Sequence, residues 1–233
     1  MPHVRYLPIA IFLLPFAAAN LAWLMSTLNG SIPVCVPYWE GCVSISGAAR
    51  QVPTIYLFRG LVIPGAVLTG VFWLLVLRWL ASADGQSRFH RVTLTLLGLA
   101  GSAFLIVYAI TLGTDTAAYR LMRRYGINLY YGLTYLAQVM LAGQLLAYAQ
   151  QMGLPRWIPR WKVGICVLTL LLGLASVFIK EWADDRRIMG NIFEWNLSVL
   201  LVGYYLLSFL AWRTSGFAGR SQRRGPGDGP ARE

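Results

Sequence analysis

Long runs of apolar residues alternate with short polar segments along most of the chain. Each of six runs has about the 20 residues that a helix needs to cross the hydrocarbon layer of a membrane. The expected spans are residues 7–28, 61–80, 92–112, 127–148, 163–179 and 192–212. The pattern therefore predicts an all-α fold, a polytopic membrane protein whose one domain, residues 1–217, is a bundle of six transmembrane helices.

The composition favours the same class, since 57% of the 233 residues are hydrophobic and only 12% are charged. A soluble domain carries about a quarter of charged residues. The net charge of +11 would indicate a nucleic-acid partner only if the basic residues formed one face of a soluble fold. Here they lie between the apolar runs, so we expect membrane lipids as partners and no nucleic acid. The sequence does not identify a protein partner or an oligomeric state.

The placement of Lys and Arg predicts the orientation, because cytoplasmic loops of membrane proteins are enriched in both. With the two termini inside, 12 of the 20 basic residues lie inside, Lys162 among them. The outer side then holds the other eight, which include Arg120, Arg123 and Arg124. The Ala, Arg and Gly content is typical of bacteria. We therefore expect an inner-membrane protein with both termini in the cytoplasm.

The two ends of the chain need separate interpretation. Arg5 followed by an apolar run and three alanines, 17–19, resembles a cleavable signal peptide, but the run continues to Leu28 and is long enough to span the membrane. The last segment, residues 218–233, is rich in Gly, Pro and Arg and has too little apolar surface to fold. It is predicted to be a disordered basic cytoplasmic tail.

The longest expected connection is an outer loop, residues 29–60, that contains Cys35 and Cys42. In an oxidising compartment these two cysteines can form a disulfide, and free thiols or a Cys-only metal site are the alternatives. Cys166 lies in an expected helix, and the two histidines, His3 and His90, fall on the inner side. We therefore expect no metal and no cofactor.

Polar residues recur at helical spacing within the apolar runs, and the expected topology places nearly all of them in the outer half of the membrane. Ionisable groups inside lipid are costly, so each one is a candidate for function. The lipid-binding candidates are Arg59, Asp115, Asn128, Tyr131, Gln138, Lys180, Asn191 and Glu194. Polar residues such as Asn20, Thr111, Ser176 and Ser198 are interpreted instead as contacts between packed helices.

Arg59 and Glu194 differ from the other candidates because an isolated charge at either position would cost several kcal/mol. A pair between the two is the natural solution. Such a pair either fixes the register of the helices or forms part of a site for a lipid head group or a substrate. The residues leave both interpretations open.

The outer loop and the last helix carry motifs of a known family. The loop reads Cys35-Val-Pro-Tyr-Trp, then Val43-Ser-Ile-Ser and Val52-Pro-Thr-Ile-Tyr-Leu-Phe-Arg59, and the last helix contains Phe193-Glu-Trp and ends in Ala211-Trp. These motifs resemble the six-pass membrane family of damage-regulated autophagy modulators and GPI-anchor lipid-remodelling factors. The resemblance implies a six-helix fold and a lipid-linked role. It also implies structural roles for the loop residues, which are Pro37, Tyr38, Ser44, Ser46 and Pro53.

Three functions remain in view. The first is binding, remodelling or distribution of a membrane lipid through a polar cavity in the outer leaflet. The second is acyl or head-group transfer with Glu194 as a general base, although the sequence shows no nucleophile or oxyanion hole to accompany it. The third is proton-coupled or ion-coupled transport, which intramembrane carboxylates can support.

Overall fold

The computed structural model describes residues 2–83, 85–114, 116–182 and 185–217, and all regular elements within these ranges are helical. The long helices are α1 (Leu7–Leu28), α4 (Thr54–Leu80), α5 (Arg88–Thr111), α6 (Ala117–Ala147), α7 (Trp157–Trp182) and α8 (Arg186–Thr214). A 3-10 helix, η1 (Pro2–Tyr6), precedes α1, and the short helices α2 (Pro37–Glu40) and α3 (Ile45–Ala49) lie between α1 and α4. The predicted tail, residues 218–233, lies outside the described residues.

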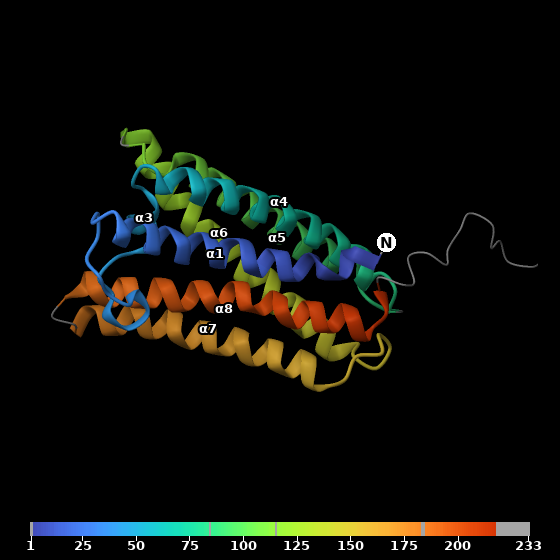
Figure 1. The fold of residues 1–233 in the computed structure, drawn as a ribbon. Helices are drawn as coiled ribbons and strands as arrows, with labels where there is room; N and C mark the ends of the chain where they lie inside the picture. The colour runs from blue at the N-terminus through green and yellow to red at the C-terminus, as the bar shows by residue number, and fades with distance from the viewer. Residues whose placement is uncertain (1, 84, 115, 183–184, 218–233) are drawn as a thin grey trace, which may run out of the picture.

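The long helices lie side by side along one axis and alternate in direction (Figure 1). The N-terminus and the end of α8 lie at one end of the bundle, here called the terminal end. The segment 29–53, with α2 and α3, lies at the opposite end, here called the loop end. Every connection between consecutive long helices therefore reverses the chain at one end or the other.

Five of the described helical segments are long and apolar enough to cross a membrane. They are His3–Leu28, Thr54–Leu80, Arg88–Thr111, Trp157–Ile179 and Arg186–Thr214. The predicted membrane class is thus confirmed at the level of five spans. The expected fourth span, 127–148, falls within α6, which is 31 residues long but has a mixed surface that includes several Tyr, Asn and Gln side chains.

The helix boundaries agree with the prediction at α1 and differ at the start of every other long helix. Helices α5, α7 and α8 begin at Arg88, Trp157 and Arg186 instead of residues 92, 163 and 192. Helix α1 begins and ends where the apolar run does. Helix α4 begins at Thr54 instead of residue 61, so Arg59 lies inside the helix and not in front of it. Helix α6 begins at Ala117 instead of residue 127, after Thr116, whose hydroxyl accepts a hydrogen bond from the Tyr119 amide. Each added segment contains charged residues, Arg59 in α4 and Arg120, Arg123 and Arg124 in α6, and a search for uncharged apolar runs therefore omits it.

Packing at the terminal end is aromatic. Phe72 and Trp73 of α4 are fully buried and contact the Tyr205 ring of α8 at centroid distances of 5.1 and 6.4 Å. Helices α5 and α6 approach closely at Gly126, where an added Cβ would lie 3.2 Å from the Tyr108 amide nitrogen. The aromatic contacts hold α4 and α8 together at the terminal end, whereas the approach at Gly126 joins α5 and α6 toward the loop end.

Lys162 was expected in an inner loop, and the structure corrects this expectation. It lies in α7 with no exposed surface. Its Nζ donates a 2.6 Å hydrogen bond to Ser208 Oγ and lies 3.4 Å from the centroid of the Tyr204 ring, both on α8. A cation over an aromatic face with a hydroxyl acceptor is a favourable arrangement for a buried ammonium. The partners are more than forty residues away in the sequence, and a charge count cannot detect them.

Candidate functional site

The segment between α1 and α4 is an ordered structure at the loop end. Cys35 and Cys42 are joined by a disulfide on either side of α2, so the first of the three sequence-based alternatives is the one observed. Pro37 occupies the first turn of α2, and Ser44 caps α3 by accepting a hydrogen bond of 3.0 Å from the Gly47 amide. Pro53 immediately precedes α4. Local side chains and the disulfide together define the shape of this segment.

Helix α8 holds the loop through a row of side chains near its beginning. Asn191 Nδ2 donates to Gly41 O at 2.7 Å, and Trp195 Nε1 donates to Val43 O at 2.9 Å. The next residue, Asn196, donates from its side-chain Nδ2 to Tyr38 O at 2.8 Å. Asn191, a predicted lipid-binding residue, therefore binds the protein's own backbone.

Glu194 belongs to the same row and points at the start of α3. Its Oε1 accepts a 3.1 Å hydrogen bond from the Ile45 amide. The amides in the first turn of a helix have no partner within the helix, so this carboxylate satisfies one of them from outside. The predicted general base is thus also a structural contact between α8 and the loop.

Tyr38 connects the loop to α1. Its hydroxyl donates to Asn20 Oδ1 at 3.0 Å, and its ring packs edge-on against Trp195. Burial raises the pKa of the Tyr38 phenol above its ordinary value of 10.0, while the hydrogen bond to Asn20 opposes the shift. The phenol is therefore protonated at neutral pH and serves as a hydrogen-bond donor.

Two hollows lie at this end of the bundle. The first, the inner cavity, has a volume of about 70 Å³ and is enclosed by α1, α4, α5, α6 and α8 beneath the loop. Its walls are mostly apolar, with Phe16, Phe58 and Val202 among them. At that volume it can hold a few atoms but not an acyl chain.

The second hollow, the lateral cleft, is ten times larger, at about 710 Å³, and lies between α6, α7 and α8. Arg120, Arg123 and Arg124 line one end of it. The other walls are largely apolar, and Leu170 and Leu174 of α7, which line it, are 47% and 50% exposed. The cleft is therefore open to the side of the bundle along α7, one of the helices long and apolar enough to cross a membrane.

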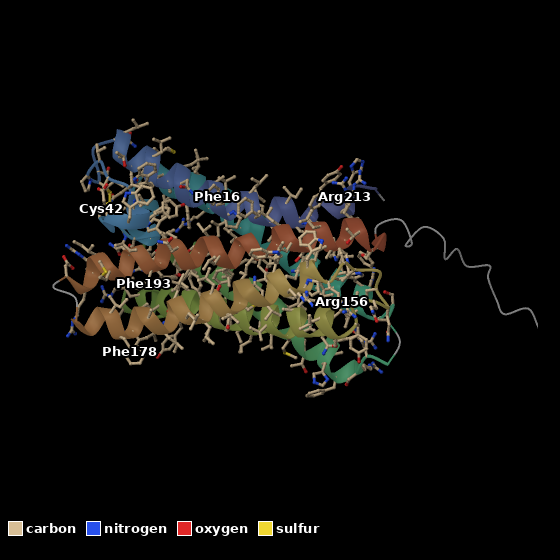
Figure 2. The ribbon with its side chains drawn as sticks, turned by 90° about the horizontal axis from the view of Figure 1, so that it is seen from below. Phe16, Cys42, Arg156, Phe178, Phe193 and Arg213 are labelled. Atoms are coloured by element: carbon tan, nitrogen blue, oxygen red, sulfur yellow. A yellow bond between two sulfur atoms is a disulfide. The ribbon has the colours of Figure 1, made fainter. Side chains whose placement is uncertain are left out.

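Figure 2 places the cleft relative to the two ends of the molecule. Phe193, which lines the cleft, lies toward the same end as Cys42, whereas Arg156 and Arg213 lie at the other end. The cleft thus begins at the loop end. Ser46 of α3 also lines it, so the loop forms part of its boundary.

A thin wall separates the inner cavity from the cleft. The residues that line both hollows are Tyr108, Ile127, Tyr131, Glu194 and Leu201. The Tyr131 hydroxyl is hydrogen-bonded to Ser198, and Ser198 Oγ donates to the Glu194 carbonyl at 2.6 Å. Tyr131 and Glu194, both predicted from helical spacing, therefore do lie together at a pocket.

The remaining predicted residues have different positions. Asn128 lines the cleft, but Gln138 is buried below it and donates to Leu201 O at 2.8 Å, which ties α6 to α8. Asp115 and the side chain of Lys180 lie outside the described residues. Gln138 thus has the packing role that polar residues between membrane helices often have.

The expected pair of Arg59 with Glu194 is replaced by other contacts. Arg59 Nε donates to Ala109 O at 3.0 Å, and its Nη2 donates to Ile110 O and Leu112 O at 2.9 and 2.6 Å. These carbonyls at the end of α5 have no partner further along the helix, and the negative end of the helix dipole favours a cation there. Arg59 lines neither hollow, so the expected centre of the site moves to Glu194 and the cleft.

Sequence reasoning used Arg120, Arg123 and Arg124 only to orient the chain. Their spacing places all three on one face of α6, immediately before the apolar part of that helix. Three arginines on one helix face next to an apolar stretch were the sequence signal for a site that binds a lipid head group beside its acyl chain. The contact with α7 and α8 that completes the cleft is not visible in the sequence.

Comparisons of the chain with protein-family models, with curated proteins and with solved structures found no match.

Proposed function

We propose that this protein is an integral membrane protein that binds a membrane lipid in the lateral cleft and helps to remodel or distribute it. The observation that carries the proposal is the amphipathic character of the cleft. Arginines line one end, and leucines from α7 and α8 are among the residues that line the rest. A lipid has the same division between a polar head and apolar chains.

The size and access of the cleft support the proposal. Its volume of about 710 Å³ falls within the range of small-molecule sites, roughly 300–1,000 Å³. Its open side lies on the segment Trp157–Ile179, which is apolar enough to lie within the membrane. A lipid can then reach the cleft from the surrounding leaflet.

We include six membrane-spanning helices in this proposal. Helix α6 is the one whose apolar pattern gives the least support. Two polar side chains of α6 find acceptors inside the bundle, since Gln138 donates to Leu201 O and Tyr135 donates to Cys166 O. With both termini in the cytoplasm of a bacterium, the loop end faces the periplasm. A disulfide between Cys35 and Cys42 is compatible with that oxidising compartment.

The resemblance of the loop to the lipid-remodelling family supports a lipid-linked role. Among enzymatic alternatives, transfer chemistry with Glu194 finds less support in the geometry. The hydroxyl nearest to Glu194 in the chain, Ser198, donates to its backbone carbonyl. A general base would need the substrate proton within hydrogen-bond reach of the carboxylate. The arrangement therefore favours binding over catalysis by this pair.

The decisive experiment introduces a large side chain into the cleft at a position where the structure has room for one. Gly132 lines the cleft, and a Cβ built on it meets nothing within 4 Å. We expect Gly132→Trp to abolish the lipid that co-purifies with the wild-type protein in native mass spectrometry. Gly143→Trp, on the same helix with equally open surroundings and outside the cleft, is the control. Equal lipid occupancy in both variants and wild type would refute the proposal.

A further inference from the structure

The three arginines form one cationic surface at the loop end of the cleft. Their positions along α6, 120, 123 and 124, follow helical spacing and direct them to one face. Arg123 is half-buried, whereas Arg120 and Arg124 are exposed. All three line the lateral cleft and contribute positive charge to it.

The charge of the cleft is strongly biased. Glu194 is the one acidic residue among the described residues that line it, against three arginines. Its Oε1 already accepts the Ile45 amide. Charges that line a cleft with low-dielectric walls attract ligands of opposite sign more strongly than charges on an open surface do. The cleft is therefore suited to an anion.

Guanidinium groups match phosphate in geometry as well as in charge. Arginine presents a planar fork of donors that binds two phosphate oxygens at once, and its charge persists at any physiological pH. Next to the arginines the walls become apolar, with Ile127, Phe193 and Leu197. A phosphate attached to hydrocarbon matches a cationic surface that adjoins an apolar wall. A free ion would leave the apolar wall without a contact.

We propose that the cleft selects an anionic phospholipid, with its phosphate at Arg120, Arg123 and Arg124 and an acyl chain between α6, α7 and α8. This inference rests on the proposed lipid-binding function and names the class of lipid. Zwitterionic lipids have the same chains and a phosphate, but their positive group opposes the cationic surface. Discrimination therefore depends on the net charge of the head group.

The test compares lipids that differ only in the head group. Purified full-length protein in detergent micelles is titrated with phosphatidylglycerol and with phosphatidylcholine of identical chains, and occupancy is followed by native mass spectrometry. We expect phosphatidylglycerol to bind about tenfold more tightly, because the choline cation of phosphatidylcholine is repelled by the arginines while both lipids present the same phosphate. Changing Arg120, Arg123 and Arg124 together to Gln should remove this preference. The double change Arg156→Gln and Arg160→Gln, at the terminal end, is the control that should keep the preference.

The possible outcomes separate the two proposals. Equal affinity of the wild-type protein for both lipids would overturn the selection of an anionic lipid, while sensitivity to Gly132→Trp would still support lipid binding. If the wild-type protein binds neither lipid, both the lipid-binding function and the selection of an anionic lipid are overturned. A further titration, with inorganic phosphate, tests whether the ligand is a free anion. Displacement of phosphatidylglycerol by millimolar phosphate would show a site for a free anion and overturn the inference.

Discussion

The amide of Ile45 and the carboxylate of Glu194 are joined by a 3.1 Å hydrogen bond that links the loop to α8 across 149 residues of sequence. The same carboxylate lines both the inner cavity and the lateral cleft. A change at Glu194 therefore acts on the loop and on the two hollows together. Experiments on this residue must separate its acceptor role from its charge.

We predict that Glu194→Gln preserves the loop and that Glu194→Ala releases it. The glutamine amide oxygen can still accept the Ile45 amide hydrogen, whereas alanine offers no acceptor. Hydrogen exchange at the Ile45 amide should be about tenfold faster in the alanine variant, which corresponds to roughly 1.4 kcal/mol of lost protection. Exchange rates that are the same in both variants would show that the bond does not order the loop.

For Arg59 the expected effect is on stability and not on lipid binding. Arg59→Ala removes three hydrogen bonds from the end of α5 and should lower the free energy of unfolding by about 1–3 kcal/mol. Thermal unfolding in detergent measures this loss. Lipid occupancy should stay at the wild-type level, since Arg59 lines neither hollow. Reduced lipid occupancy in an Arg59→Ala protein of unchanged stability would indicate that Arg59 belongs to the binding site.

Gly41 tests how closely the loop packs on α8. Its φ of +62° is unfavourable for other residues, and an added Cβ would collide with the Ile188 carbonyl oxygen. Gly30 has a similar φ of +68° but open space around it, so Gly30→Ala reports the backbone cost alone. We expect Gly41→Ala to lower the thermal midpoint clearly more than Gly30→Ala does. Equal losses would mean that the loop moves away from α8 without cost.

The contact between Lys162 and Ser208 predicts a non-additive pair of mutations. Ser208→Ala leaves the buried ammonium without its 2.6 Å acceptor and should destabilise the protein by about 1–3 kcal/mol. Lys162→Met keeps an apolar body of similar length and removes the charge, so we expect little change in stability. In the double variant the cost of Ser208→Ala should largely disappear. Additive losses in thermal unfolding would exclude a significant interaction between the two side chains.

The fold was predictable where local sequence determines it. The apolar run of residues 7–28 coincides with α1, and the other long runs overlap helices of the structure, with only residues 112 and 148 falling one position beyond α5 and α6. Boundaries failed where a helix extends beyond a charged residue that interrupts the apolar pattern, as at Thr54 before Arg59 and at Ala117 before Arg120, Arg123 and Arg124. A helix continues through such a residue when its side chain finds a partner, as Arg59 does at the α5 carbonyls.

The site was predictable only in part, for the same physical reason. Helical spacing placed Asn128, Tyr131 and Glu194 on the walls of one cleft. It could not assign partners, because a partner depends on which helices pack together. Arg59 therefore bonds to α5 carbonyls instead of Glu194, and Lys162 finds Ser208 in the interior.

The exposed position of Leu170 and Leu174 along the cleft has a consequence for exchange kinetics. A lipid that moves sideways from the leaflet keeps its chains in hydrocarbon throughout, so no methylene incurs the cost of about 0.8 kcal/mol that exposure to water entails. The barrier to exchange then lies in breaking the contacts of the head group. Residence time in the cleft would accordingly depend on ionic strength more than on chain length.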